Sequence, residues 1–111
     1  MNGYVTVLGT DYVILLRNWD DDRKLHDAYA YIEPYTKEIV LRELVPDCMT
    51  VKRHEQLREE ALRHELVHAF LFESGMTDWC DDEKLVEWIA MQLPKMAAAM
   101  QEAGAMPHAD G

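Results

Sequence analysis

The sequence contains little cysteine, a minority of basic residues and no long apolar run. Its two cysteines, Cys48 and Cys80, form no CxxC motif and are too few for a disulfide framework. We interpret both as thiols in a reducing compartment, each acting as a small, semi-buried apolar residue. Lys and Arg number 11 against 21 Asp and Glu, which gives a formal net charge of -10. Because this charge repels phosphate backbones, we expect no nucleic-acid partner.

No apolar stretch approaches the roughly 20 residues that a membrane-spanning helix requires, so we expect no membrane association. The first residues, Met1 to Val7, have neither the basic region nor the sustained apolar region of a secretory signal. We therefore expect a cytoplasmic protein. A length of 111 residues, of which 49% are hydrophobic, predicts a single folded domain covering residues 1–111.

Strand patterns occupy the first part of the chain. Alternating or β-branched apolar residues predict four strands, at Tyr4–Leu8, Tyr12–Arg17, Ala28–Ile32 and Lys37–Leu44. Gly9 and the residues after it suit a hairpin turn between the first two strands. The strand at Lys37–Leu44 has charged residues on both faces, which predicts that it lies at an edge of the sheet. The acidic run at residues 20–22 lacks the spacing of a calcium-binding loop and is interpreted as a solvated loop.

Helical patterns occupy the second part. A long helix is predicted from about residue 50 to residue 74, with Gly75 as its C-cap. After a loop, a second helix begins at Asp81 or Asp82, and Pro94 is expected to end or kink it. The tail from Gly104 is expected to be irregular. The predicted fold class is α+β: a small antiparallel or mixed sheet of about three or four strands, then the long helix and the proline-kinked helix.

The segment His64-Glu65-Leu66-Val67-His68 has the pattern HExxH. Each residue turns a helix by about 100°, so histidines at this spacing project from the same side and can bind one zinc ion. Glu65 can reach a water beside the ion without binding the ion itself. The alternative is a set of ordinary surface residues on an amphipathic helix. Apolar residues surround the motif, however, and they predict a buried helix in which ionisable groups need a role.

Two histidines leave a catalytic zinc ion one protein ligand short. Glu73 lies about half a turn from His64 around the helix, so we interpret it as a solvated residue near the helix end. Glu83 and Glu87 share one stripe of the second helix among apolar residues. One of these acids can be the third ligand, and the other can accept a hydrogen bond from a ligand imidazole. A solvated acidic face is the alternative interpretation.

These residues resemble the gluzincin metallopeptidases, in which the HExxH helix is followed by a Glu-x-x-x-Asp/Glu motif on the next helix. The resemblance implies that Glu83 joins the two histidines as a zinc ligand and that Glu65 is the general base. It also implies that Glu87, where Asp is commoner in the family, supports a ligand histidine.

The chain is also similar to the compact minigluzincins and to small phage-encoded and bacterial proteins with a segment like LRHELVHAFLFESG, which here is Leu62–Gly75. The motif-bearing part covers about Leu62 to Leu93, and the rest matches only in layout. This similarity implies a zincin-like fold and peptide hydrolysis.

We therefore expect zinc-dependent cleavage of a peptide or protein substrate, with water activated by Glu65. The predicted edge strand at Lys37–Leu44 can pair with a substrate backbone. The resemblance also implies an oxyanion-stabilising residue and, in minigluzincins, a C-terminal segment that can block the site, for which His108 is one candidate residue. The candidates for the oxyanion role are Tyr29, Tyr31, Tyr35, His54 and His108. The alternative function is a non-catalytic or latent zinc-binding module for interaction or regulation, which a fourth ligand such as Cys80 would favour.

Overall fold

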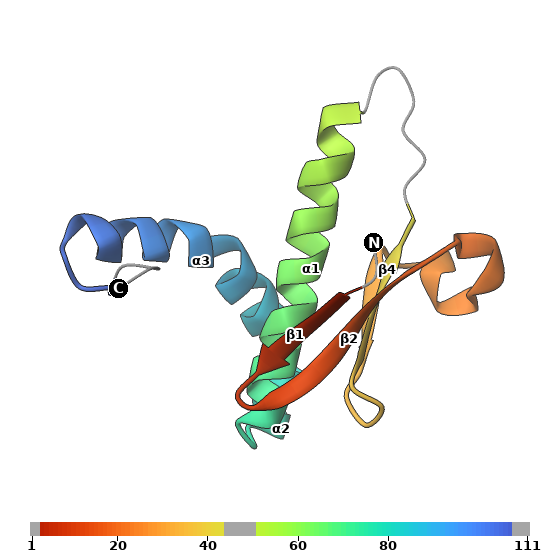
Figure 1. Ribbon diagram of the computed structural model, residues 1–111, viewed down its shortest axis with the longest axis horizontal. Helices are drawn as coiled ribbons and strands as arrows, with labels where there is room; N and C mark the ends of the chain where they lie inside the picture. The colour runs from red at the N-terminus through yellow and green to blue at the C-terminus, as the bar shows by residue number, and fades with distance from the viewer. Residues whose placement is uncertain (1–2, 44–50, 108–111) are drawn as a thin grey trace.

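The structure is a computed structural model that describes residues 3–43 and 51–107. A sheet comes first, followed by a long helix, a short helix and a second long helix (Figure 1). The strands are β1 (Gly3–Val7), β2 (Thr10–Arg17), β3 (Ala30–Glu33) and β4 (Glu38–Arg42). The helices are α1 (Val51–Glu73), α2 (Thr77–Cys80) and α3 (Glu83–Glu102). The predicted α+β class is confirmed.

The sheet is mixed, with the strand order β1-β2-β4-β3. β1 and β2 form an antiparallel hairpin whose turn contains Leu8 and Gly9, both with positive φ. This backbone matches the twist of a tight hairpin, which explains a glycine at this point. β3 and β4 form a second hairpin, and β4 pairs in parallel with β2. The connection between the hairpins contains two 3-10 turns, η1 (Trp19–Asp21) and η2 (Arg23–His26). In the acidic run, predicted to be a solvated loop, Asp20 and Asp21 are exposed and lie in η1, whereas Asp22 is half-buried and extended.

The prediction that Lys37–Leu44 forms an edge strand is wrong. β4 lies between β2 and β3, so the edges of the sheet are β1 and β3. Ile39, Val40 and Leu41 are all buried, which means that both faces of β4 are covered. Consecutive apolar residues are the mark of such a strand. The charges that suggested an edge belong to the ends of the strand, where Lys37 lies in the turn and Glu38 begins the pairing.

Helix α1 packs across one face of the sheet. Ala69 of α1 is fully buried against a cluster of strand residues that includes Val7, Tyr12, Ile14 and Ile39. Partly buried side chains of α1 surround this contact; they are Ala61, Leu62 and Leu66. The HExxH segment is therefore held on the sheet by the main hydrophobic core.

Helix α1 ends where the sequence predicted. The N–H of Gly75 donates to the carbonyl of Phe72, and the N–H of Met76 donates to the carbonyl of Leu71. This is the Schellman pattern, which needs the left-handed backbone that Gly75 adopts with φ 79°. The loop predicted next contains a short helix, α2, which leads directly into α3.

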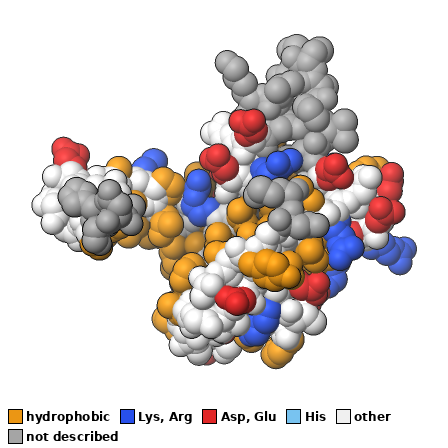
Figure 2. All heavy atoms as spheres, in the orientation of Figure 1, with side chains coloured by type: hydrophobic (Ala, Val, Ile, Leu, Met, Phe, Trp, Pro, Cys, Tyr) orange, Lys and Arg blue, Asp and Glu red, His pale blue; other side chains and the backbone are white. Residues whose placement is uncertain are grey.

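Helix α3 contacts the body of the protein through its first half. Val86 and Ala90 pack with Val67 of α1 in a second, smaller cluster. Pro94 lies inside the helix, which bends part-way along and projects from the body (Figure 1). Apolar side chains are exposed where α3 leaves the body (Figure 2); they include Trp88, Met91, Leu93 and Met96. No helix in the described ranges is long and apolar enough to cross a membrane.

Candidate metal centre

Helix α1 carries both histidines of the HExxH segment toward α3. The ring centroids of His64 and His68 are 5.0 Å apart, as expected for residues one turn apart. Val67 and Ala69 flank His68 in the sequence and are buried, the first in the cluster with α3 and the second in the cluster with the sheet. The packing of these neighbours fixes the helix on two sides and sets the direction in which the imidazoles point.

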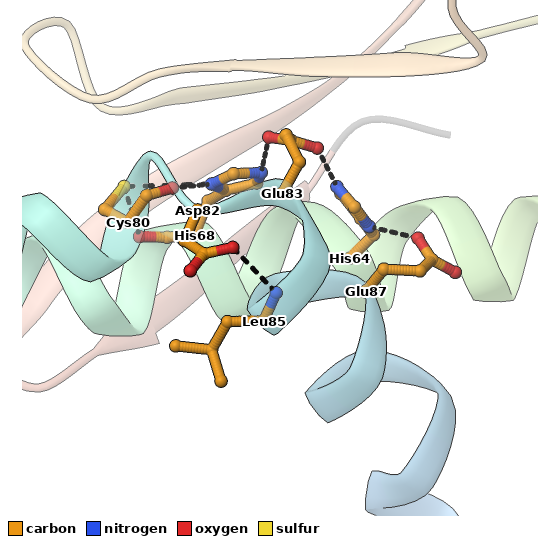
Figure 3. A network of polar contacts seen from close by, with 7 residues as sticks. All are labelled: His64, His68, Cys80, Asp82, Glu83, Leu85 and Glu87. Atoms are coloured by element: carbon orange, nitrogen blue, oxygen red, sulfur yellow. Dashed lines mark hydrogen bonds and ion pairs between the residues drawn. The ribbon is translucent and has the colours of Figure 1, made fainter.

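The first turn of α3 brings a carboxylate to both imidazoles. The side chain of Asp82 accepts a hydrogen bond from the N–H of Leu85 and caps the helix, so that Glu83 is its first residue. The carboxylate of Glu83 lies 3.1 Å from Nε2 of His64 and 2.8 Å from Nε2 of His68 (Figure 3). The start of α3 thus supplies an acid opposite the two histidines of α1.

The other ring nitrogens contact acceptors. Nδ1 of His68 lies 2.7 Å from the backbone carbonyl oxygen of Cys80, which can only accept, so this nitrogen donates. Nδ1 of His64 lies 2.8 Å from Oε2 of Glu87, a distance that suits an N–H donating to a carboxylate. In neutral imidazoles this leaves the lone pairs on the two Nε2 atoms, which both face Glu83. Lone pairs from two rings and a carboxylate therefore converge, and a cation between them would relieve their repulsion.

The His64, His68 and Glu83 group could hold a metal ion. One ligand atom from each residue lies within 4.8 Å of the others. Tetrahedral zinc, with bonds of about 2.0–2.2 Å, separates its ligand atoms by roughly 3.5 Å. The two contacts of Glu83, at 3.1 and 2.8 Å, are made by different oxygens, and single ligand atoms of the three residues lie within 4.8 Å of one another, so this value falls within the observed spread. Glu87 and the Cys80 carbonyl would hold the ligand imidazoles in position from behind.

Cys80 does not belong to this group. Its Sγ lies 3.7 Å from Nδ1 of His68, whereas Glu83 faces the Nε2 side of the same ring. Burial raises the pKa of the Cys80 thiol, and the nearby Asp81 and Glu83 add to this effect. A buried neutral thiol is a poor metal ligand. Among the residues that the structure describes, three side chains form the ligand group and Cys80 is not a fourth.

Glu65 is buried beside the ligand group, with 8% of its surface exposed. Burial raises the pKa of its carboxyl above the ordinary value of 4.5, and Glu83 acts in the same direction. The neighbouring His68 and His64 oppose this rise. A carboxyl group whose pKa is raised by burial beside candidate metal ligands is typical of a group used in general acid–base chemistry.

An open cleft of about 460 Å³ lies beside the ligand group. One wall is formed by Ala28, Tyr29 and Ala30, at and just before the start of edge strand β3. The other wall comes from α1 and α3 and includes His64, Glu65 and Glu83. Glu60 also lines this wall, one turn before His64. The sequence interpretation did not include it, although its spacing of four residues from His64 places it on the same side of the helix.

Of the candidates for the oxyanion role, the described cleft contains Tyr29. The hydroxyl of Tyr31 donates to Asp22, and Tyr31 is not among the residues that line the cleft. Tyr35 is exposed and its ring contacts Phe72 at the far end of α1. His108, the side chain of His54, and Cys48 lie outside the described part of the chain.

The prediction that Glu73 is a solvated residue is wrong. Its side chain is only 13% exposed. It accepts hydrogen bonds from the hydroxyl of Tyr12 at 2.6 Å, from the hydroxyl of Thr10 at 3.0 Å and from Nζ of Lys37 at 2.7 Å. Glu73 therefore ties the end of α1 to the sheet. Helical spacing correctly separated it from the histidines but gave no information about its partners across the fold.

The chain matches no family model, no curated protein and no solved structure in comparisons with known proteins.

Proposed function

We propose that the protein is a zinc-dependent peptide hydrolase. The observation that carries this proposal is the convergence of His64, His68 and Glu83 beside the buried carboxyl of Glu65 at an open cleft. Two imidazoles and one carboxylate form a usual protein ligand set for catalytic zinc, which keeps a position open for water or substrate. When bound, zinc supplies Lewis acidity that polarises a carbonyl and makes a water more acidic.

The residues of the chain account for the proton transfers. Glu65 takes a proton from the attacking water as its oxygen bonds to the scissile carbonyl carbon. The same carboxyl delivers that proton to the amine nitrogen as the C–N bond breaks. The products are a carboxylic acid and an amine, and transfer of the second water proton between them gives a carboxylate and an ammonium group. Glu87 and the carbonyl of Cys80 keep Nδ1 of each histidine occupied as a donor, so that Nε2 stays available as a ligand.

The position of β3 at the edge of the described sheet supports a peptide as substrate. β3 is an edge strand, and the residues around its start line the cleft. An extended peptide can pair with such an edge through its backbone, which would place it between the sheet and the ligand group. This assignment moves the substrate-binding role from the predicted Lys37–Leu44 strand to β3. Tyr29, in the same wall, is then the proposed oxyanion-stabilising residue.

Metal content is the first test. Protein purified without added metal, or incubated with zinc at neutral pH, should contain close to one zinc per chain by elemental analysis. His68→Ala and Glu83→Ala should lose most of it. Glu65→Gln should keep the zinc but lose peptide cleavage by about 100-fold or more, the usual contribution of a general base. Absence of zinc from the wild type under both conditions would refute the proposal.

The alternative, a non-catalytic zinc module, predicts the same metal content but no peptide cleavage. The absence of a fourth protein ligand among the described residues supports the catalytic proposal, since structural zinc sites are usually closed by four protein ligands. Retention of zinc by the wild type, without cleavage of any member of a broad peptide library, would favour the non-catalytic module.

A further inference from the structure

Among the residues that the structure describes, the charged residues that line the cleft are all acidic. They are Glu60, Glu65, Glu83 and Glu87. A bound divalent cation with neutral histidines would leave two negative charges in excess, or one if Glu65 carries a proton. The whole chain has a net charge of -10, so its long-range field acts in the same direction. A cationic group is therefore favoured in the loaded cleft.

Glu60 differs from the other three acids of the cleft in its contacts with the described residues. Glu83 and Glu87 contact the histidines, and Glu65 is buried beside them. Glu60 is exposed, and within the described ranges its carboxylate has no hydrogen bond or ion pair. Arg63 and Lys95 line a neighbouring hollow of about 200 Å³ together with Glu60, but neither of them pairs with its carboxylate.

The position of Glu60 relates it to the scissile bond. It lies four residues before His64, so it occupies the same side of α1 about 6 Å closer to the start of the helix, at 1.5 Å per residue. An extended peptide advances about 3.3 Å per residue. For a peptide that runs along α1, a side chain that reaches Glu60 therefore belongs to a residue about two positions from the bond at the ligand group.

We propose that the substrates of this site are peptides with a Lys or Arg within about two residues of the scissile bond, recognised by Glu60. This proposal rests on the proposed function and adds the substrate class to it. The basic side chain pairs with the exposed carboxylate, while the peptide backbone lies along β3. An exposed ion pair contributes up to about 1 kcal/mol, or a preference of roughly fivefold.

The test uses quenched-fluorescent heptapeptides in which Lys, norleucine or Glu is placed at each internal position in turn. Norleucine keeps most of the length of the Lys side chain and removes the charge. At one position the wild type should cleave the Lys peptide with a kcat/KM roughly fivefold above the norleucine peptide, and the Glu peptide should be poorer still. Glu60→Gln should bring the ratio of Lys to norleucine close to one.

Glu59→Gln is the matched control. Glu59 is the exposed neighbour of Glu60 in α1 and does not line the cleft. Its substitution removes the same charge from the chain, so it should preserve the full ratio of Lys to norleucine. An equal fall in that ratio for both variants would overturn the assignment to Glu60, because the preference would then come from the overall charge.

A measurement of peptide binding tests this inference separately from the proposed hydrolase function. The Lys and norleucine peptides are titrated by calorimetry against zinc-loaded Glu65→Gln protein, with and without Glu60→Gln. Tighter binding of the Lys peptide that depends on Glu60 supports the inference even if the wild type cleaves nothing, in which case only the hydrolase proposal fails. Cleavage by the wild type with no preference for Lys at any position overturns the inference and leaves the hydrolase proposal standing.

Discussion

Glu87 offers a direct test of how the chain prepares its histidines for a metal. Its carboxylate lies 2.8 Å from Nδ1 of His64 and has no direct contact with His68 among the described interactions. If it orients His64 and keeps the proton on Nδ1, its removal should weaken zinc binding without removing a ligand. Glu83, by contrast, lies within 3.1 Å of Nε2 on both rings. Substitutions of Glu83 and Glu87 should therefore weaken zinc binding to different extents.

The expected loss of zinc affinity depends on how exposed the contact between Glu87 and His64 is. Partners that support a ligand histidine typically contribute 10–100-fold to metal affinity. The side chain of Glu87 is 55% exposed, so solvent screens the interaction and the lower end of this range applies. Glu87→Ala should weaken zinc binding about tenfold, which corresponds to about 1.4 kcal/mol. Glu87→Gln should lose less, because its amide oxygen can still accept the hydrogen bond from Nδ1.

Competition with a chromophoric chelator at neutral pH measures these affinities. Glu59→Gln again serves as the control for charge alone, and circular dichroism checks that α3 remains folded. An affinity for Glu87→Ala within twofold of the wild type would refute the supporting role. A loss as large as that of Glu83→Ala would also refute it, since Glu87 would then act as a ligand itself.

Three further predictions concern the scaffold. Hydrogen bonds from Lys37 and Tyr12 lower the pKa of Glu73 below 4.5, so its stabilising contribution is complete above that pH and is lost as the pH falls through the folded value. Chemical denaturation should accordingly show a penalty for Glu73→Gln that is greatest at neutral pH and shrinks in acid, and a penalty independent of pH would contradict the network. Ile39→Ala should cost about 3 kcal/mol of unfolding free energy in the same assay, because the side chain is fully buried in β4. Gly75→Ala should lower the free energy of unfolding by about 1 kcal/mol. The cost comes from the left-handed backbone alone, since no neighbouring atom obstructs a Cβ there. An unchanged melting temperature would refute this reasoning.

Local patterns predicted the features that depend on local chemistry. The period of the apolar residues and the glycine after them predicted α1 and its end. The start of α3 was predicted at Asp81 or Asp82, and Asp82 is the cap. The spacing of His64, His68, Glu83 and Glu87 predicted residues that the structure brings together, because each pair shares one side of a helix. The relative placement of the two helices came from the family resemblance rather than from spacing.

Long-range partners could not be predicted in this way. The place of β4 in the sheet depends on β3 returning beside it, and the charges at its ends concealed its buried centre. The partners of Glu73 come from strands that lie about sixty residues earlier or in the second hairpin. The contact of His68 with the carbonyl of Cys80 involves the backbone, which every residue possesses, so no sequence pattern marks it.

The contacts of α1 and α3 indicate that a bound metal would also stabilise the fold. α1 is held on the sheet by the main core, but α3 joins it through the small cluster of Val67, Val86 and Ala90 and then projects outward. The ligand group draws on both helices, with two histidines from α1 and Glu83 from α3. Metal binding would therefore add a cross-link at a joint held by a small apolar cluster, and its binding free energy would become folding free energy for α3. Hydrogen exchange should slow on addition of zinc in the first turns of α3 more than in the strands, and uniform slowing would count against a metal at this joint.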